Sequence, residues 1–130
     1  MARYPTTMDV IAMNAEIMER MGGEHILRDE AALESAVMRP QMAAHYGSAD
    51  LAEQAATLMA GVALAHGFVD GNKRTALAAG LTFLSLNGYL VATRRTELGE
   101  QVLALVERTG SVDEAVGKFA AWLREHLESI

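Results

Sequence analysis

The sequence contains no cysteine, only two prolines and few aromatic residues, and each shortage excludes a class of structure. Without cysteine the chain forms no disulfide and offers no thiolate to a metal ion or to covalent catalysis. Aromatic residues make up 5% of the chain and hydrophobic residues 51%, so most of the apolar content is Ala, Leu and Met. These residues favour helices over strands, and the composition therefore predicts an all-α protein.

Positive charge is scarce as well. The chain carries 17 acidic and 11 basic residues, for a formal net charge of −6. Phosphate backbones and anionic lipids repel such a protein, so we expect neither a nucleic-acid partner nor a membrane surface as partner. No apolar run approaches the length of about 20 residues that a membrane span requires, and the first residues lack the apolar core of a signal peptide. We therefore expect a cytoplasmic protein.

No internal repeat or flexible linker divides the 130 residues, so we expect a single domain over residues 1–130. Helical spacing of apolar residues, together with capping signals, predicts a compact bundle of about six helices. The predicted helices follow Thr6 and Thr7 as far as Gly22, then span about 29–38, 51–65 and 72–86, and resume after Thr96 and after Ser111.

Four local features refine this prediction. Pro40 disfavours helical backbone at the preceding residue, so the second helix is expected to end at about Met38. The helices over residues 51–65 and 72–86 are apolar on nearly every side, which is typical of buried helices. Residues 89–92 are expected to form a short extended piece. The first helix is expected to bury one face, formed by Met8, Ile11, Ala15 and Met18.

The loop between the two central helices is unusually polar. It carries His66, Asp70, Asn72, Lys73 and Arg74. Burying so many polar groups without partners costs several kcal/mol, so a ligand is expected to satisfy them. If the second central helix begins near Asn72, its first N–H groups have no acceptor and its end carries a partial positive charge. Gly71 allows close approach of a ligand, and Lys73 and Arg74 add positive charge, so the segment predicts an anion site.

His66 ends the preceding helix, where its imidazole could accept the proton of an attacking hydroxyl group. Asp70 lies between this histidine and the anion site, and it is expected to hold Mg²⁺ on the phosphates or to orient the nucleophile. The alternative is that Asp70 only caps the following helix. A base, a metal ligand and a phosphate site within nine residues suit transfer from a nucleotide to a hydroxyl group.

The same residues resemble the signature of the Fic/Doc superfamily. The Fic signature reads H-x-F-x-[D/E]-G-N-G-R-x-x-R, whereas the death-on-curing (Doc) branch has Lys after the Asn, followed by Arg-Thr-Ala. Here Asn72 is followed by Lys73, Arg74, Thr75 and Ala76, which is similar to the Doc form. The resemblance implies a compact helical bundle in which the motif joins two central buried helices.

The resemblance also implies roles for single residues. His66 would be the catalytic base and Asp70 the acidic residue, and the phosphates of ATP would contact Gly71, Asn72, Lys73 and Arg74. Leu77 stands where typical Fic proteins have a second arginine, which implies transfer of the γ-phosphate to a Ser/Thr hydroxyl of a protein. Transfer of AMP and a catalytically silent binding module are the alternatives.

The Doc branch finally implies partners. Such proteins are the toxins of type II toxin-antitoxin systems, and the family precedent for the substrate is elongation factor Tu, whose modification inhibits translation. The expected partners are therefore a cognate antitoxin, a protein substrate, ATP and Mg²⁺.

Overall fold

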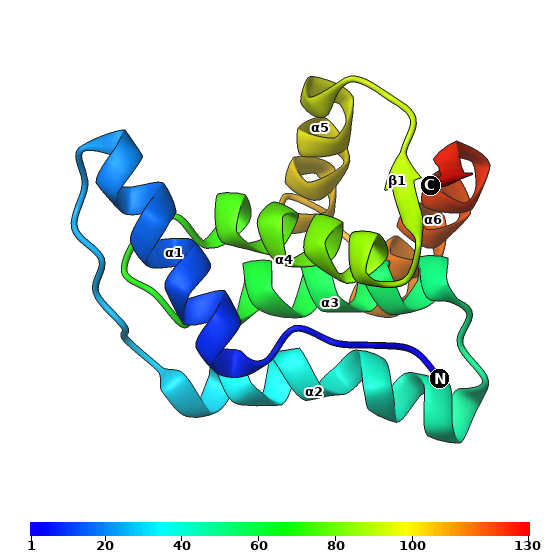
Figure 1. Cartoon of the computed structure of the whole chain (residues 1–130), viewed down its shortest axis with the longest axis horizontal. Helices are drawn as coiled ribbons and strands as arrows, with labels where there is room; N and C mark the ends of the chain where they lie inside the picture. Colours follow the sequence, from blue (N-terminus) through cyan, green and yellow to red (C-terminus); the bar gives the residue numbers. More distant parts are fainter.

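A computed structural model describes all 130 residues and shows a mostly helical protein (Figure 1). Its helices are α1 (Thr7–Met21), α2 (Glu30–Gly47), α3 (Leu51–Ala65), α4 (Asn72–Leu86), α5 (Arg95–Val106) and α6 (Val112–His126). Strands β1 (Tyr89–Val91) and β2 (Leu127–Ser129) pair antiparallel, with Leu90 opposite Glu128. The predicted helical bundle is confirmed, and the extended piece near residue 89 is β1, whereas β2 was not predicted. None of the helices combines the length and the apolar character needed to cross a bilayer.

Helix α3 lies at the centre of the bundle and packs on α2, α4, α5 and α6 (Figure 1). Ten of its residues are buried, and most of them are Ala or Gly. Small side chains let neighbouring helices approach closely: a Cβ added at Gly61 would lie 3.1 Å from the Cβ of Ala36 on α2. The predicted ranges of the two central helices, 51–65 and 72–86, are confirmed.

The predicted end of the second helix is wrong, because α2 continues through Pro40 to Gly47. Proline lacks an N–H and removes one hydrogen bond, which normally ends or kinks a helix. The carbonyl oxygen of Ala36, which that bond would have reached, lies 3.5 Å from the position of a Cβ at Gly61. Pro40 and Val37 are both buried. Packing of this face against α3 therefore offsets the lost hydrogen bond.

The buried face of α1 agrees with the prediction only in part: Met18 is buried and Ile11 packs against the core as a partly buried residue. Val10, Asn14 and Met18 are the buried residues, whereas Met8 is 71% exposed. Helical spacing fits both sets of residues, so only the packing partner, chiefly α4, selects between them. The true stripe contains a polar residue, Asn14, which lies beneath the loop between α3 and α4.

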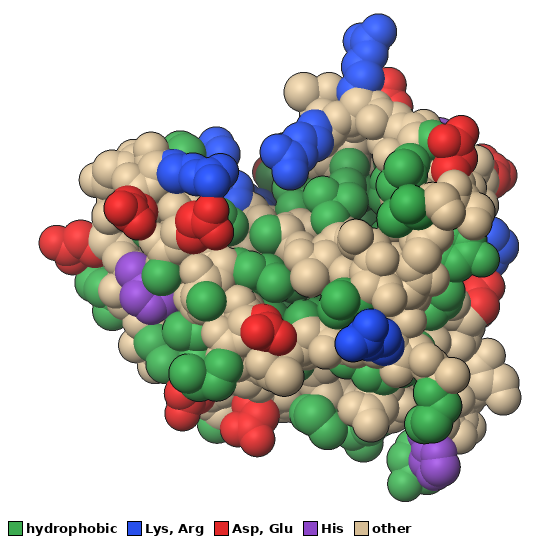
Figure 2. Space-filling view, viewed as in Figure 1, with side chains coloured by type: hydrophobic (Ala, Val, Ile, Leu, Met, Phe, Trp, Pro, Cys, Tyr) green, Lys and Arg blue, Asp and Glu red, His purple; other side chains and the backbone are tan.

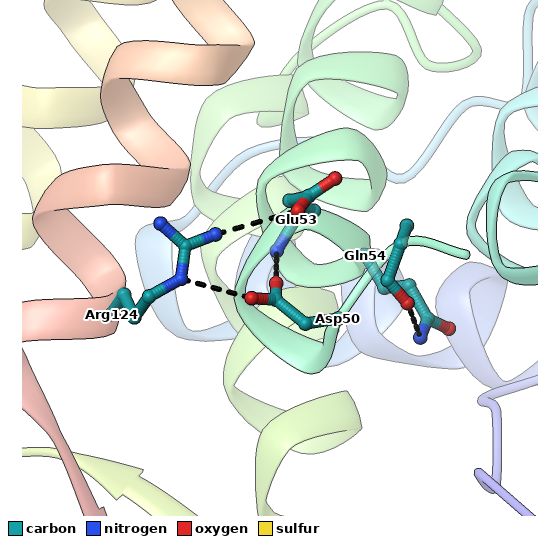
Figure 3. A network of polar contacts seen from close by, with 5 residues as sticks. Asp50, Glu53, Gln54 and Arg124 are labelled. Carbon is teal, nitrogen blue, oxygen red and sulfur yellow. Dashed lines mark hydrogen bonds and ion pairs between the residues drawn. The ribbon is translucent and has the colours of Figure 1, made fainter. Parts of the chain in front are cut away.

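Side-chain caps fix the start of most helices. Thr6, Asp29, Asp50 and Ser111 each accept a hydrogen bond from a backbone N–H in the first turn of the helix that follows. Asp50 has a second partner: Arg124 of α6 donates to its carboxylate at 2.9 Å and to Glu53 at 3.5 Å (Figure 3). This contact joins the last helix to the start of the central one.

Asp50 should therefore stabilise the fold both as a cap and as a charge. The hydrogen bond from Arg124 is the main cause that lowers the pKa of Asp50, and its partial burial opposes it. Asp50→Ala should reduce the free energy of unfolding by about 1 kcal/mol, the usual cost of a lost N-cap. Asp50→Asn keeps an oxygen for the cap and should cost less.

The contribution of the Asp50 charge to the free energy of unfolding should depend on pH. The pKa of Asp50 in the folded protein lies below its unfolded value of about 4. The stability that this charge adds is therefore complete above about pH 4, and it is lost as the pH falls through the folded pKa of Asp50. Urea unfolding should show that the gap between wild type and Asp50→Asn closes in that range. A gap that stays constant down to pH 2 would contradict the ion pair.

Candidate active site

Residues 66–71 connect α3 to α4 and lie against the connection between α1 and α2. Leu27 and Phe68 form an antiparallel bridge, and the N–H of Val69 donates to the carbonyl of Ile26 at 3.0 Å. The N–H of Arg28 donates to the carbonyl of Gly67 at 2.6 Å. The backbone of one connection therefore holds the other in place.

The side chains of Asp70 in the loop and of Asn72 at the start of α4 bind the backbone of the loop. Asn72 accepts from the N–H of Phe68 at 3.1 Å and donates to the carbonyl of the same residue at 2.8 Å. Asp70 accepts from the N–H of Gly71 at 2.7 Å. The ring of Phe68 is buried in the core and anchors the loop there. Hydrogen bonds to its own backbone therefore hold the loop in addition to the bonds from the connection between α1 and α2.

As a result, α4 begins without a side-chain cap. Its N-cap is Gly71, and the interpretation of Asp70 as a helix cap is wrong because its carboxylate binds the N–H of Gly71 instead. Thr75 is the first residue of α4 whose backbone N–H donates to a carbonyl, that of Gly71 at 2.9 Å. The N–H groups of residues 72–74 therefore remain available to a ligand, at the positive end of the helix dipole.

Gly71 is suited to this position for two reasons. Its φ of +80° lies in the left-handed region that favours glycine. A Cβ there would also lie 2.7 Å from the Sδ of Met18, which is closer than non-bonded atoms approach. A larger residue would be strained at this φ and would force the side chain of Met18 to move.

All six predicted site residues line one cleft of about 440 Å³, and they are His66, Asp70, Gly71, Asn72, Lys73 and Arg74. The C-terminal end of α1 forms the opposite wall, and Val106 of α5 closes one side. Figure 2 shows Lys and Arg side chains on both sides of a hollow between α1 and α5. The structure thus brings the predicted residues together, as the spacing implied.

His66 ends α3 with a φ of +49°, one of two positive values outside glycine in the chain. Such a conformation is costly for most residues and is often found at functional sites. Its carbonyl accepts from the Nη1 of Arg28 at 3.2 Å, which helps to hold it. The ring is exposed to the cleft and makes no hydrogen bond within the chain, so both ring nitrogens are free to meet a substrate.

The positive charges of Lys73 and Arg74 are not neutralised by the protein. The ion pairs of the chain involve only Arg20 and Arg124 among its basic residues. Both Lys73 and Arg74 are exposed at the cleft. Two free cations beside an uncapped helix start are well suited to a phosphate group.

The site offers one carboxylate to a metal ion. No group of three or more His, Asp or Glu side chains could hold a cation by itself. Asp70 keeps its Oδ2 free of hydrogen bonds while Oδ1 binds Gly71. Mg²⁺ in nucleotide sites commonly takes one or two carboxylates and completes its shell with phosphates and water. Asp70 therefore fits a magnesium ion that arrives with a nucleotide, but not a permanent metal site.

Sequence reasoning missed the residues beneath the loop. Asn14 donates to the carbonyl of Asp70 and to Thr75, and its oxygen binds the ring of His25, which packs on Phe68. The signal was a polar residue on the buried stripe of α1. Its partners lie far away in sequence, so the pattern alone could not identify them.

Comparisons with known proteins indicate the family of the chain. The chain is 47% identical over 73 residues to a protein named Toxin Doc from Mycolicibacterium smegmatis, a match covering 55% of this chain and 56% of that protein. It is 36% identical over 90 residues to a protein named Protein kinase doc from Escherichia phage P1, covering 68% and 71%. Residues 4–84, which include α1 to α3, the polar loop and most of α4, match the Fic/DOC family profile. With its motif loop set between two buried helices, the chain belongs to the Fic/DOC family.

Proposed function

We propose that the chain transfers the γ-phosphate of ATP to a Ser or Thr hydroxyl of a protein. The observation that carries the proposal is the shared cleft, in which the free ring of His66 lies beside the uncapped start of α4 and the unpaired Lys73 and Arg74. A base next to an anion site is the arrangement that phosphoryl transfer to a hydroxyl requires.

In this mechanism a ring nitrogen of His66 takes the proton of the substrate hydroxyl. The hydroxyl oxygen bonds to the γ-phosphorus, and the bond from that phosphorus to the β–γ bridging oxygen breaks, which releases ADP. The N–H groups of residues 72–74, together with Lys73 and Arg74, stabilise the charge on the phosphates. A magnesium ion held by Asp70 would neutralise further charge on the triphosphate.

The position of the basic residues favours the γ-phosphate over AMP as the transferred group. Leu77 lies one turn after Arg74 and packs against the core, so no cation continues along this face of α4. The second arginine of typical Fic proteins is therefore absent. The name of the phage relative, a protein kinase, agrees with this choice. By family precedent the proposed substrate is elongation factor Tu.

Labelled ATP tests the reaction directly. With Mg²⁺ and elongation factor Tu, label should enter the protein substrate from γ-labelled ATP and not from α-labelled ATP. His66→Ala should reduce the transfer by at least about 100-fold, since general-base catalysis contributes 10²–10⁴. His45→Ala, on the exposed side of α2, is the matched control and should retain full activity. Label entering only from the α position would instead establish AMP transfer.

Nucleotide affinity tests the anion site without turnover. Arg74→Ala and Lys73→Ala should each weaken ATP binding by about 10- to 100-fold, because a charge-assisted hydrogen bond is worth about 1.5–3 kcal/mol. Lys118→Ala removes the same charge from α6 and lines a different cleft, so it should leave the affinity nearly unchanged. Isothermal titration calorimetry measures the Kd for ATP of all three variants. Equal losses in all three variants would reveal general electrostatics and contradict a local site.

We further propose that the chain is a toxin restrained by an antitoxin protein, as the name of the mycobacterial relative suggests. Induced expression in bacteria should arrest growth, and His66→Ala should abolish the arrest. Co-expression with the neighbouring gene product should restore growth, and the two proteins should co-purify. Equal arrest by wild type and His66→Ala would favour a catalytically silent binding module.

A further inference from the structure

One polar side chain lies entirely inside the protein beneath the candidate active site. Asn14 of α1 is 0% exposed. Its Nδ2 donates to the carbonyl of Asp70 and to the Oγ1 of Thr75, both at 3.0 Å, and its Oδ1 lies 2.7 Å from the Nδ1 of His25. A single amide therefore joins α1, the connection after it, the motif loop and α4.

The hydrogen bonds fix the orientation of this amide. Both N–H groups of Nδ2 have acceptors, so Oδ1 must be the acceptor toward His25, whose Nδ1 carries the proton. Turning the amide over would bring Oδ1 against the carbonyl of Asp70, where two acceptors would repel each other. The network is complete in one arrangement only, which is the condition under which a buried polar network specifies a unique structure.

The two donated bonds lie on either side of the anion site. Asp70 precedes and Thr75 follows the start of α4, where the N–H groups of residues 72–74 are free and Lys73 and Arg74 line the cleft. Between them, the position of a Cβ at Gly71 is only 3.1 Å from Nδ2, so the chain passes directly over the amide. An apolar residue at position 14 would fill the space but would leave the carbonyl of Asp70 without this donor.

We infer that Asn14 is a positioning residue: it holds Asp70 and the first turn of α4 in the orientation that phosphate transfer requires. The predicted effect on the reaction rests on the proposed function, whereas the predicted effect on the loop does not. Asn14 touches no substrate and acts through Asp70 and Thr75. Since small misplacement of reacting groups can cost about 100-fold in rate, its loss should affect turnover more than nucleotide binding.

Two substitutions isolate the donated bonds. Asn14→Asp has nearly the same shape and can still accept from His25, but it loses both donors. Thr75→Val removes one acceptor, retains the bond to Asp70 and adds no charge. The matched control is Gln54→Glu, because Gln54 is also buried and also donates to a backbone carbonyl, that of Ala49 at 3.0 Å. At 1.5 Å per residue along α3, it lies roughly 18 Å from His66.

Amide hydrogen exchange in the free protein tests the effect on the loop. At matched global stability, Asn14→Asp should speed exchange at the amides of Gly71 and Thr75 by about 10-fold or more, and Thr75→Val should do so to a smaller extent. Gln54→Glu should leave both amides unchanged. Unchanged exchange in Asn14→Asp would overturn the inference, and if that variant does not fold, Thr75→Val decides in the same way.

Kinetics test the consequence for the reaction. Asn14→Asp should lower kcat by about 10- to 100-fold while the KM for ATP changes by less than about 3-fold, and Gln54→Glu should change neither. An equal loss of kcat in both variants would show a general effect of destabilisation and overturn the positioning role. If the wild type transfers no phosphate, the proposed function fails, while the exchange experiment still decides whether Asn14 holds the loop.

Discussion

The N–H groups at the start of α4 have no acceptor within the protein, and the arrangement around them depends on this. Four other helices use a Thr, Asp or Ser side chain to satisfy the same groups. Here Asp70 and Asn72 are suitable capping residues, yet they bind Gly71 and Phe68 instead. The helix start gives up a cap worth about 1 kcal/mol, and the cleft gains donors for an anion.

An open helix start must be held by other contacts, and these come from three directions. Phe68 anchors the loop in the core, the backbone of residues 26–28 pairs with it from outside, and Asn14 supports it from below. None of these contacts uses a group that faces the cleft. The supporting network and the binding groups are therefore separate, which allows a rigid loop to keep its ligand donors free.

Local signals account for the parts of the structure that could be predicted. Ser111 and Asp50 cap helices through residues three positions away, so both helix starts could be inferred from short segments. The proposed site residues could be grouped from the sequence because the motif is contiguous, and the structure places them in one cleft. Pro40 was misjudged because its cost is offset by packing on α3, a long-range contact. Asn14 was missed for the same reason, since its partner Asp70 is 56 residues away.

The acidic composition does not conflict with an anion site. A net charge of −6 acts over the whole surface, and at physiological ionic strength such long-range interactions are screened within about 8 Å. A triphosphate inside the cleft would meet Lys73, Arg74 and the end of the α4 dipole at shorter range. A nucleic acid, in contrast, would extend over the acidic surface beyond the cleft. The net charge from which we expect no polyanionic partner is therefore compatible with a small anion in the cleft.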